Sequence, residues 1–382
     1  MLLRLGFILF LAITMLIQPQ EVISGATQGL ALWWQFVLPA LLPFFILSEL
    51  MLSVGFVRLF GVLLEPLMRP LFRLPGCASF VIAMGYTSGF PMGAILANRL
   101  YEQGDLTKKQ AEHLIAFTNN PSLGFIFGAV AVGMMRQAQL GVVIAASVYL
   151  ANLLVGLCLR FLHPRPVLSA NFGVSFRQQL LQCLQPQPQA PLPAGQLLGQ
   201  AIRASIQTTL SVGGFIVFFS VVIRLLTQWH IFTLLAALPH MLLPCISTER
   251  WAALFSGFIE MTIGCRNVVA AFPDSAWQVS LVCLLMGWNG LSILAQVAGL
   301  IDRSLSLKPY VYARLLHALL VVCLSRLFLA LAHVPTLRLP HEFSMRGAIH
   351  FTWLLSFQSF LCLSLILCAL GIICRVVIRQ TH

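Results

Sequence analysis

The chain has 382 residues, of which 59% are hydrophobic and only 9% are charged, and its mean hydropathy is +0.91. This composition excludes an ordinary soluble domain, and the long continuous apolar runs exclude an outer-membrane barrel, whose strands alternate. The formal net charge is +12, but the Lys and Arg residues lie between the apolar runs rather than on one soluble face, which argues against a nucleic-acid partner. We therefore expect an all-α polytopic membrane protein in contact with the lipid bilayer.

The ten cysteines and nine histidines are scattered along the chain. No two cysteine pairs have the spacing of a zinc site, and a cysteine within an apolar run behaves as a small hydrophobe. The GxSxG, HExxH and P-loop motifs are also missing. We therefore expect no metal site, no cofactor and no enzyme activity.

Apolar runs that could approach or cross a membrane core of about 30 Å, which takes about 20 helical residues, follow one another along the chain. In the first half they lie at 5–18, 29–54, 77–98, 114–135 and 138–160. In the second half they lie at 201–227, 231–246, 251–272, 277–300, 311–334 and 350–374. The Pro- and Gln-rich segment 163–200 between the halves has the composition of a linker.

The placement of Lys and Arg predicts the membrane topology. Arg4 places the N-terminus in the cytoplasm, and Arg375 and Arg379 place the C-terminus there. Basic residues flank run 77–98 at both ends, so we expect it to enter and return on one side, as its glycines and proline permit. Run 251–272 is expected to re-enter from the opposite side. The prediction is about eight transmembrane helices plus two re-entrant helical hairpins in an inverted repeat.

Five parts follow from this topology. They are an N-terminal membrane helix, 1–28; a first repeat, 29–162; a cytoplasmic linker, 163–200; a second repeat, 201–335; and a C-terminal membrane helix with a basic tail, 336–382. A parallel duplication, or a hairpin that crosses the membrane completely, is the alternative arrangement. For the first helix, the alternative to a retained span is a cleaved signal peptide.

A polar motif occurs twice at nearly constant spacing. Its copies are Ser88-Gly89-Phe90-Pro91-Met92-Gly93-Ala94 with Asn119-Asn120-Pro121-Ser122, and Ser256-Gly257-Phe258-Ile259-Glu260-Met261-Thr262-Ile263-Gly264 with Asn289-Gly290-Leu291-Ser292. Ser88 and Ser256 are 168 positions apart, and Asn120 and Asn289 are 169 apart. Glycine and proline break helices and free backbone groups that polar side chains or a solute can satisfy. The repeat therefore predicts a shared binding site at membrane depth.

The candidate binding residues form two layers around this site. The hairpin turns supply Ser88, Gly89, Gly93, Ser256 and Gly257. The breaks and the helix after them supply Asn119, Asn120, Ser122, Asn289, Ser292 and Gln296. Exposed N–H groups at half-helix N-termini would favour an anionic substrate. The structural alternative for each residue is that small side chains permit close packing and polar ones join helices.

Glu260 is the acid within the second copy of the motif, far from either end of its apolar run. A buried carboxylate is unfavourable unless it is protonated, paired or hydrated. Glu260 is therefore a candidate proton carrier or cation ligand. The alternatives are a carboxylate at the outer interface of the membrane and a structural ion pair with Arg266. The ion pair would need a break in the helix because residues six apart do not share a helical face.

The helix that leads to the first pair of asparagines has its own start signal. Thr107 and Gln110 stand three residues apart, as in a capping box. We expect this helix to deliver Asn119 into the membrane, and we assign the capping residues a structural role only.

Several segments carry a resemblance to a known family. They are Met84-Gly-Tyr-Thr-Ser-Gly-Phe-Pro-Met-Gly-Ala94, Leu100-Tyr-Glu-Gln-Gly104, Ala116-Phe-Thr-Asn-Asn-Pro-Ser122, Gly257-Phe-Ile-Glu-Met-Thr-Ile-Gly264 and Gly287-Trp-Asn-Gly-Leu-Ser292. These segments resemble the YlbJ-type sporulation integral membrane proteins, and the likeness covers most of the two repeats. That family belongs to a wider group with a Gate, or nucleoside-recognition, domain, which is similar to parts of concentrative nucleoside transporters and bacterial ferrous iron transporters.

The resemblance implies a transporter of the bacterial cell (inner) membrane, with 29–162 and 201–335 as Gate-like repeats. In spore formers it implies a link to the supply of dipicolinic acid, a small aromatic dianion. We therefore expect a small organic anion as substrate, with a proton or cation as a candidate coupling ion. The alternatives are a non-transporting sporulation or envelope scaffold, which would bind partners through 163–200, and a nucleoside-type solute carrier. A homo-oligomer is an open alternative to a monomer.

Overall fold

The computed structural model describes residues 2–162 and 193–331, and the predicted C-terminal span at 350–374 lies outside them. The described residues form fifteen α-helices and no strand. Four helical stretches are long and apolar enough to cross a membrane, namely Leu140–Leu159, Ala194–Gln228, Ser275–Leu300 (two consecutive helices) and Lys308–Leu331, or up to six spans if each of two bent helix pairs counts as one. The prediction of an all-helical polytopic membrane protein is confirmed.

The helices of the two halves follow in the same order. The first half contains α1 (Leu2–Ile17), α2 (Pro19–Leu32), η1 (Trp33–Val37), α3 (Leu38–Ser53), α4 (Phe56–Phe72), α5 (Ala78–Thr87), α6 (Met92–Glu102), α7 (Lys108–Thr118), η2 (Phe125–Met134) and α8 (Leu140–Leu159). The second contains α10 (Ala194–Gln228), α11 (Ile231–Leu242), α12 (Thr248–Ile259), α13 (Met261–Ala271), α14 (Ser275–Trp288), α15 (Gly290–Leu300) and α16 (Lys308–Leu331). Each half has a long helix, a shorter helix after it, a helical hairpin, a broken helix and a closing helix.

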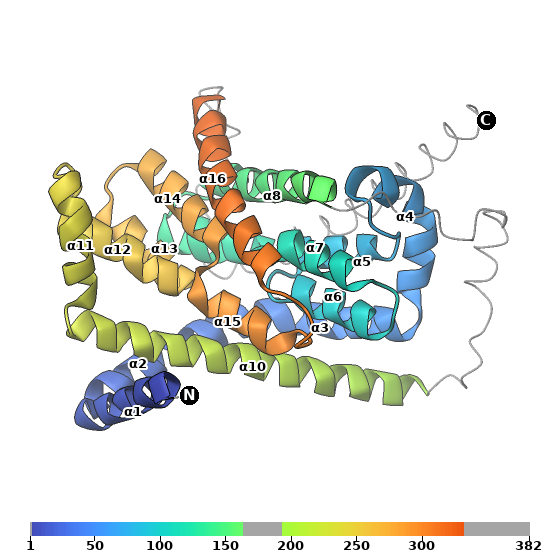
Figure 1. Cartoon of the computed structure of the whole chain (residues 1–382), viewed down its shortest axis with the longest axis horizontal. Helices are drawn as coiled ribbons and strands as arrows, with labels where there is room; N and C mark the ends of the chain where they lie inside the picture. Colours follow the sequence, from blue (N-terminus) through green and yellow to red (C-terminus); the bar gives the residue numbers. More distant parts are fainter. Residues whose placement is uncertain (1, 163–192, 332–382) are drawn as a thin grey trace.

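The long helices of the two halves pack against each other in opposite directions. The helices α2, η1 and α3 continue one another over residues 19–53, and α10 runs beside them (Figure 1). A Cβ on Gly29 would lie 2.8 Å from Ser220 Oγ, and Trp33 Nε1 donates to the Thr209 carbonyl at 3.1 Å. Rising numbers on one helix meet falling numbers on the other, so these equivalent helices are antiparallel.

The starts of the two long helices differ from the expected runs, and a proline lies at each start. The first long helix begins at Pro19 instead of residue 29, after a bend of 102° from α1. α10 begins at Ala194, inside the segment expected to be a linker, because Pro193 is the last proline before it and takes the N-cap position. Proline suits a helix start because its missing N–H is not needed there. The first residues of each long helix are more polar than the rest, so the apolar runs are shorter than the helices.

The shorter helices α4 and α11 lie at opposite ends of the molecule (Figure 1). α4 is bent by 85° from α3. Gly55, between α3 and α4, has a φ of 75°, and His230, between α10 and α11, has a φ of 56°. One left-handed residue therefore makes each turn, a conformation that costs glycine little. Equivalent turns at opposite ends agree with the antiparallel long helices.

Each half also contains a helical hairpin whose arms are shorter than a membrane span. α5 and α6 have 10 and 11 residues, and α12 and α13 have 12 and 11. At 1.5 Å per residue an arm reaches about 15 to 18 Å, roughly half of the hydrocarbon core. In the second hairpin a Cβ on Gly264 would lie 2.0 Å from Gly257 Cα, so the two arms touch through their backbones. A pair of short helices therefore lies at each of the runs 77–98 and 251–272.

The broken helices are interrupted at the repeated polar motif. Residues 119–124 between α7 and η2 include a non-helical stretch from 119 to 122. Between α14 and α15 the chain turns at Asn289 and Gly290, whose φ values are 73° and 77°. The predicted capping box also starts α7, because Thr107 N donates to Gln110 Oε1 at 2.9 Å and Gln110 N to Thr107 Oγ1 at 3.4 Å.

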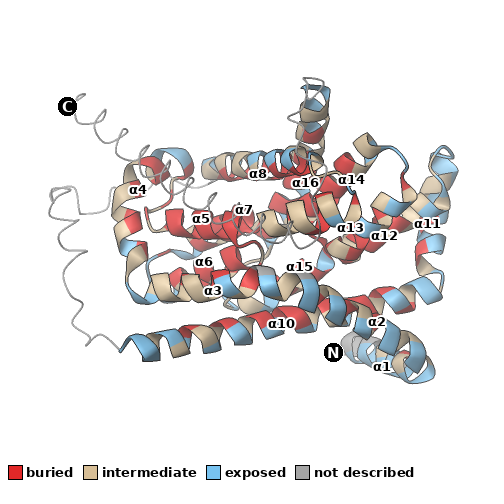
Figure 2. Ribbon diagram, turned by 180° about the vertical axis from the view of Figure 1, so that it is seen from behind, coloured by how far each residue is buried: buried red, intermediate tan, exposed pale blue. Residues whose placement is uncertain are grey.

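Buried residues concentrate in the hairpins and broken helices, whereas α1 and much of α10 and α11 are exposed (Figure 2). Large apolar side chains occupy the exposed faces as well, with Leu16 and Met241 each 80% exposed. Apolar side chains on both the inside and the outside of a helical fold are typical of a protein surrounded by lipid. The polar motif therefore lies in the protected centre of the described structure.

Candidate functional site

A cavity of about 520 Å³, counted with its open mouth, lies between the two halves. The first half lines it with Val37, Leu41, Gly89, Phe90, Ser122 and Phe125. The second half lines it with Val212, Ile216, Glu260, Thr262, Ile293 and Gln296. Each half thus contributes six residues.

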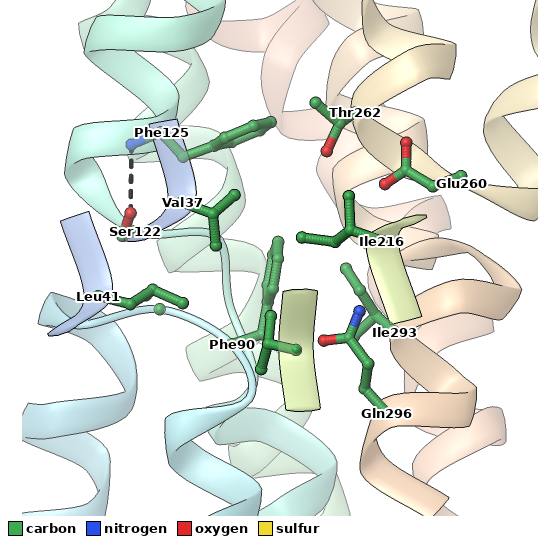
Figure 3. A pocket seen from close by; sticks show the side chains of 12 residues that line it. Val37, Leu41, Phe90, Ser122, Phe125, Ile216, Glu260, Thr262, Ile293 and Gln296 are labelled. Atoms are coloured by element: carbon green, nitrogen blue, oxygen red, sulfur yellow. Dashed lines mark hydrogen bonds between the residues drawn. The ribbon is translucent and has the colours of Figure 1, made fainter. Parts of the chain in front are cut away.

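Equivalent elements of the two halves line this cavity. The long helices, the hairpin turns and the segments at the helix breaks all contribute residues from both halves. The side chains of the two halves face each other across the cavity (Figure 3). This arrangement agrees with the packing of the long helices, which run side by side in opposite directions.

The lining is mostly apolar and has four polar side chains, namely Glu260, Ser122, Thr262 and Gln296. Glu260 is the only ionisable residue among the lining residues, and it is 3% exposed. Its Oε2 accepts the Ile263 N–H at 2.7 Å, which caps the N-terminus of α13. The carboxylate is therefore held in place by a helix end and still borders the cavity.

Arg266 does not form the ion pair with Glu260 that was the structural alternative. Within residues 2–162 and 193–331, no ion pair within 4.0 Å includes Glu260. Arg266 is exposed, and with the Gln28 amide turned so that its oxygen faces the guanidinium, that oxygen accepts from Arg266 Nη1 at 2.9 Å. The helix break that an ion pair with Glu260 would need is present at Glu260, but the Arg266 guanidinium binds Gln28 in α2 instead.

Three short helices begin beside the cavity. Gly89 and Phe90 precede α6, Phe125 opens η2, and Glu260 caps α13. At η2 the Ser122 hydroxyl accepts the Phe125 N–H at 3.2 Å, whereas α6 has no side-chain cap (Figure 3). Each helix N-terminus carries up to about half a positive charge. The cavity thus combines one carboxyl group with several positive helix ends.

Behind the cavity lies a buried cation that the sequence analysis did not single out. Arg314 in α16 is 1% exposed. Its Nη2 donates to the Ala116 carbonyl at 2.6 Å and to Asn152 Oδ1 at 2.8 Å. Its Nη1 donates to the Asn119 carbonyl at 3.1 Å and to His317 Nδ1 at 3.1 Å. The two carbonyls lie at the C-terminal end of α7, the negative end of that helix.

The repeated asparagines meet in the same network. Asn289 Nδ2 donates to the Asn119 carbonyl at 3.2 Å and to the Tyr310 hydroxyl at 3.3 Å. Asn119 Nδ2 donates to the same hydroxyl at 3.2 Å, and Asn152 Nδ2 donates to Asn120 Oδ1. The breaks of the two halves are therefore in direct contact, through Asn119 rather than through Asn120.

The twelve residues proposed from sequence fall into three groups. Those that line the cavity are Gly89, Ser122, Glu260 and Gln296. Those buried at the breaks and outside the lining are Asn119, Asn120, Asn289 and Ser292, whose hydroxyl accepts from Gln296 Nε2 at 3.4 Å. Those within the hairpins and outside the lining are Ser88, Gly93, Ser256 and Gly257.

Close packing describes the contacts of the hairpin group. A Cβ on Gly93 would lie 2.5 Å from the Thr118 carbonyl, so α6 approaches α7 closely there. Ser256 Oγ donates to the Ala253 carbonyl at 2.7 Å and accepts from Asn267 Nδ2 at 2.9 Å. These are the contacts that the structural alternative anticipates for small and polar residues between helices.

Sequence reasoning missed the apolar lining, including Phe90 and Phe125, and it missed Arg314. For the apolar residues no signal exists, since lipid-facing and cavity-facing positions have the same composition. For Arg314 the signal was available, because it lies inside the predicted run 311–334. An ionisable residue within such a run is by itself a reason to expect a buried site.

Comparison with known proteins assigns the family. Residues 35–138 match the model of the Gate family, described as nucleoside recognition. Sporulation integral membrane protein YlbJ of Bacillus subtilis (strain 168) is 40% identical over 320 residues, which cover 81% of this chain and 78% of the relative. An uncharacterized protein of Alkalihalophilus pseudofirmus is 27% identical over 112 residues, or 29% of this chain and 24% of that protein. No solved structure is significantly similar.

The Gate match covers α3 to η2, and thus the first hairpin and the first break. The match to the Bacillus relative is long enough to include both halves of the cavity in part or whole. Its identity and coverage show the family rather than the fold class alone. The chain is a bacterial, multi-pass membrane protein that belongs to the YlbJ family of sporulation integral membrane proteins and carries a Gate domain.

Proposed function

We propose that this protein is a carrier that moves a small solute through the cavity between its halves. The observation that supports this most directly is the lining itself, in which each half contributes six residues from equivalent elements. Carriers built from inverted repeats bind their substrate at such an interface, among half-helices that end near the middle of the bilayer. A scaffold would have no use for a cavity shared by both halves.

The proposed membrane arrangement follows from the antiparallel long helices. The two hairpins enter from opposite sides of the bacterial inner membrane, and each reaches roughly half of its thickness. With the C-terminal segment outside the described residues, the full count is about eight spans and two re-entrant hairpins, and both chain ends are cytoplasmic. Movement of one half against the other would then open the cavity to each side in turn.

We propose a small organic anion as the substrate class. The N-termini of α6, η2 and α13 place positive helix ends beside the cavity, which favours a negatively charged group. Phe90 and Phe125 offer aromatic surface for a planar ring. A small aromatic dianion such as dipicolinate has both features. Glu260 would then be protonated, or bind a cation, when the anion enters, which couples transport to that ion.

An uncharged solute of the nucleoside type is a second candidate. The supporting observation is that the cavity lining includes Glu260 and no basic side chain. Hydroxyl and amide groups from Ser122, Thr262 and Gln296 could bind a sugar or base without any charge on the solute. The two candidates differ in whether the transported solute carries charge, and transport measurements separate them.

Counterflow in vesicles tests the carrier proposal. The purified full-length protein is reconstituted, the vesicles are loaded with one unlabelled solute, and the uptake of the same labelled solute is followed. Dipicolinate, a nucleoside and a simple carboxylate are compared. We expect counterflow of dipicolinate above that of empty vesicles. The absence of counterflow for all three solutes would contradict the carrier proposal, and counterflow of the nucleoside alone would favour the second candidate.

The role of Glu260 is tested by Glu260→Gln. The glutamine oxygen can still accept the Ile263 N–H, so the start of α13 is preserved while the proton site is removed. We expect transport by this variant to lose its dependence on a proton or cation gradient. Glu249→Gln is the matched control, because Glu249 lies on α12 of the same hairpin and is exposed. Full gradient dependence in Glu260→Gln would exclude Glu260 as the coupling residue.

A further inference from the structure

The guanidinium of Arg314 is held by neutral groups only. Both Nη nitrogens have two acceptors each, and these are two main-chain carbonyls, an amide oxygen and an imidazole nitrogen. Within residues 2–162 and 193–331, no carboxylate lies within 4.0 Å of this guanidinium. A buried cation without a carboxylate depends on the dipoles around it, and here the C-terminal end of α7 supplies them.

The same arrangement of main-chain carbonyls at a helix C-terminus is typical of a site for a free cation. In carriers with broken helices, main-chain carbonyls at the C-terminal end of a half-helix bind the cation, and half-helix N-termini face the anionic groups of the substrate. Here the carbonyls of Ala116 and Asn119 surround a nitrogen cation that is part of the chain. On the other side of the break, Ser122 and Phe125 line the cavity. The break therefore has a negative helix end on the side of Arg314 and a positive helix end on the side of the cavity, as in those carriers.

The Nη groups of Arg314 are not available to bind an anionic substrate. The four Nη hydrogens of Arg314 can all be used by its four acceptors, whereas its buried Nε has no hydrogen-bond partner among the described residues. The residue is also absent from the cavity lining. Its role is therefore to hold the break in place, and through it the position of Ser122 at the cavity.

The closing helix of the first half supplies no equivalent cation to the second break. α8 corresponds to α16 in the order of elements, and its twenty residues, Leu140–Leu159, include no Lys or Arg. The acid Glu260, conversely, has no counterpart in the first hairpin, whose turn reads Ser88-Gly89-Phe90-Pro91. The correspondence between the two halves is thus broken twice, by a cation at the first break and by an acid at the second hairpin.

We propose that the C-terminal end of α7, together with Asn152, is a monovalent-cation site that the guanidinium of Arg314 occupies permanently. The tethered side chain takes the place of an exchangeable ion such as sodium at this break. The first break therefore keeps one cation at every stage, and no free cation binds there. This inference is independent of the carrier proposal, because an ion site can be measured by binding alone.

Arg314→Ala tests this inference in the purified full-length protein. Thermal unfolding is recorded in low millimolar guanidinium, sodium or potassium chloride, with choline chloride at the same ionic strength as the reference. We expect Arg314→Ala to unfold at a lower temperature than the native protein. Guanidinium should raise its Tm roughly with the logarithm of the concentration, as for any ligand that binds only the folded state. The native protein should show no such rise, because its site is filled.

Arg326→Ala is the matched control on the same helix. The Arg326 guanidinium stacks on Trp277 at 4.2 Å, and none of its bonds joins the two halves at the breaks. We expect the Tm of Arg326→Ala to be insensitive to guanidinium. An Arg314→Ala protein whose Tm responds to none of the three cations would overturn the proposal.

A second pair of variants tests the inference if Arg314→Ala yields no folded protein. Arg314→Lys keeps a tethered cation, whereas Arg314→Gln keeps hydrogen-bond donors without the charge. We expect Arg314→Lys to be recovered with a higher Tm than Arg314→Gln, or to be the only one recovered. Equal recovery and equal Tm of the two variants would show that the charge is not needed and would overturn the proposal.

Discussion

Replacing Asn152 with alanine should destabilise the protein by more than the loss of one hydrogen bond. Asn152 Nδ2 donates to the Phe117 carbonyl at 2.6 Å and to Asn120 Oδ1, and its Oδ1 accepts from Arg314 Nη2 at 2.8 Å. The side chain is 0% exposed. One truncation therefore removes a partner from three buried polar groups at once.

The loss of stability depends on which hydrogen-bond partners these three groups retain after the substitution. The Phe117 carbonyl has no helical partner, because the residue four positions later is Pro121, which has no N–H. The Arg314 Nη2 retains the Ala116 carbonyl. A buried polar group without a partner costs about 1–3 kcal/mol, so two such groups and one weakened charged donor amount to roughly 3–5 kcal/mol.

Thermal unfolding of the purified protein in detergent measures this effect. We expect the Tm of Asn152→Ala to fall by an amount on the order of 5 to 10 °C. The control is Asn267→Ala, which removes a single bond of 2.9 Å from Asn267 Nδ2 to Ser256 Oγ at a half-buried position. That change should cost about 1 kcal/mol. Equal Tm shifts in the two variants would refute the reasoning, because the network would then contribute no more than one ordinary hydrogen bond.

Other features lead to predictions of the same kind. Gly264→Ala should reduce folded yield and transport far more than Gly257→Ala, because the added Cβ meets backbone at 2.0 Å in the first variant and a flexible leucine side chain at 2.4 Å in the second; equal losses would contradict this. Glu112→Ala should speed hydrogen exchange of the Ser306 amide about tenfold or more, because Glu112 Oε1 accepts that N–H at 2.7 Å; an unchanged rate would show that the bond does not protect the amide. Hydrogen bonds from the serine two positions later lower the pKa of Asp302, in the loop before α16. The ionised carboxylate therefore stabilises the loop at pH values above its ordinary pKa, and this stabilisation is lost as the pH falls through the lowered pKa. Hydrogen exchange of the loop amides should therefore accelerate only in acid.

The hairpins and the breaks could be predicted from sequence because local chemistry specifies them. Gly89 and Asn289 adopt positive φ values of 87° and 73° at the turns, where few other residues are stable. Thr107 and Gln110 form the capping box that their spacing predicts. Such features depend on residues within a few positions of one another, so no knowledge of the fold is needed.

From the sequence, a buried site at Arg314 could be expected, but the partners of its guanidinium could not be predicted. A single arginine in an apolar run can extend to the lipid headgroups or turn into the protein, and its neighbours in sequence do not distinguish the two. Its acceptors come from α7 and α8, between 162 and 198 positions earlier in the chain, and from His317. The identity of those partners depends on how α16 packs across the first half.

The sequence by itself determined that the protein is a helical membrane protein and where its helices turn and break, and it showed that these features occur twice. Only the tertiary structure decided which repeated residues meet and which merely pack. It brought Asn119 to Asn289, placed Glu260 at the cavity and withdrew Gly93 and Gly257 from it. The physical reason is that turns and breaks are set by backbone preferences within a few residues, whereas a cavity is set by the faces that helices distant in sequence turn toward each other.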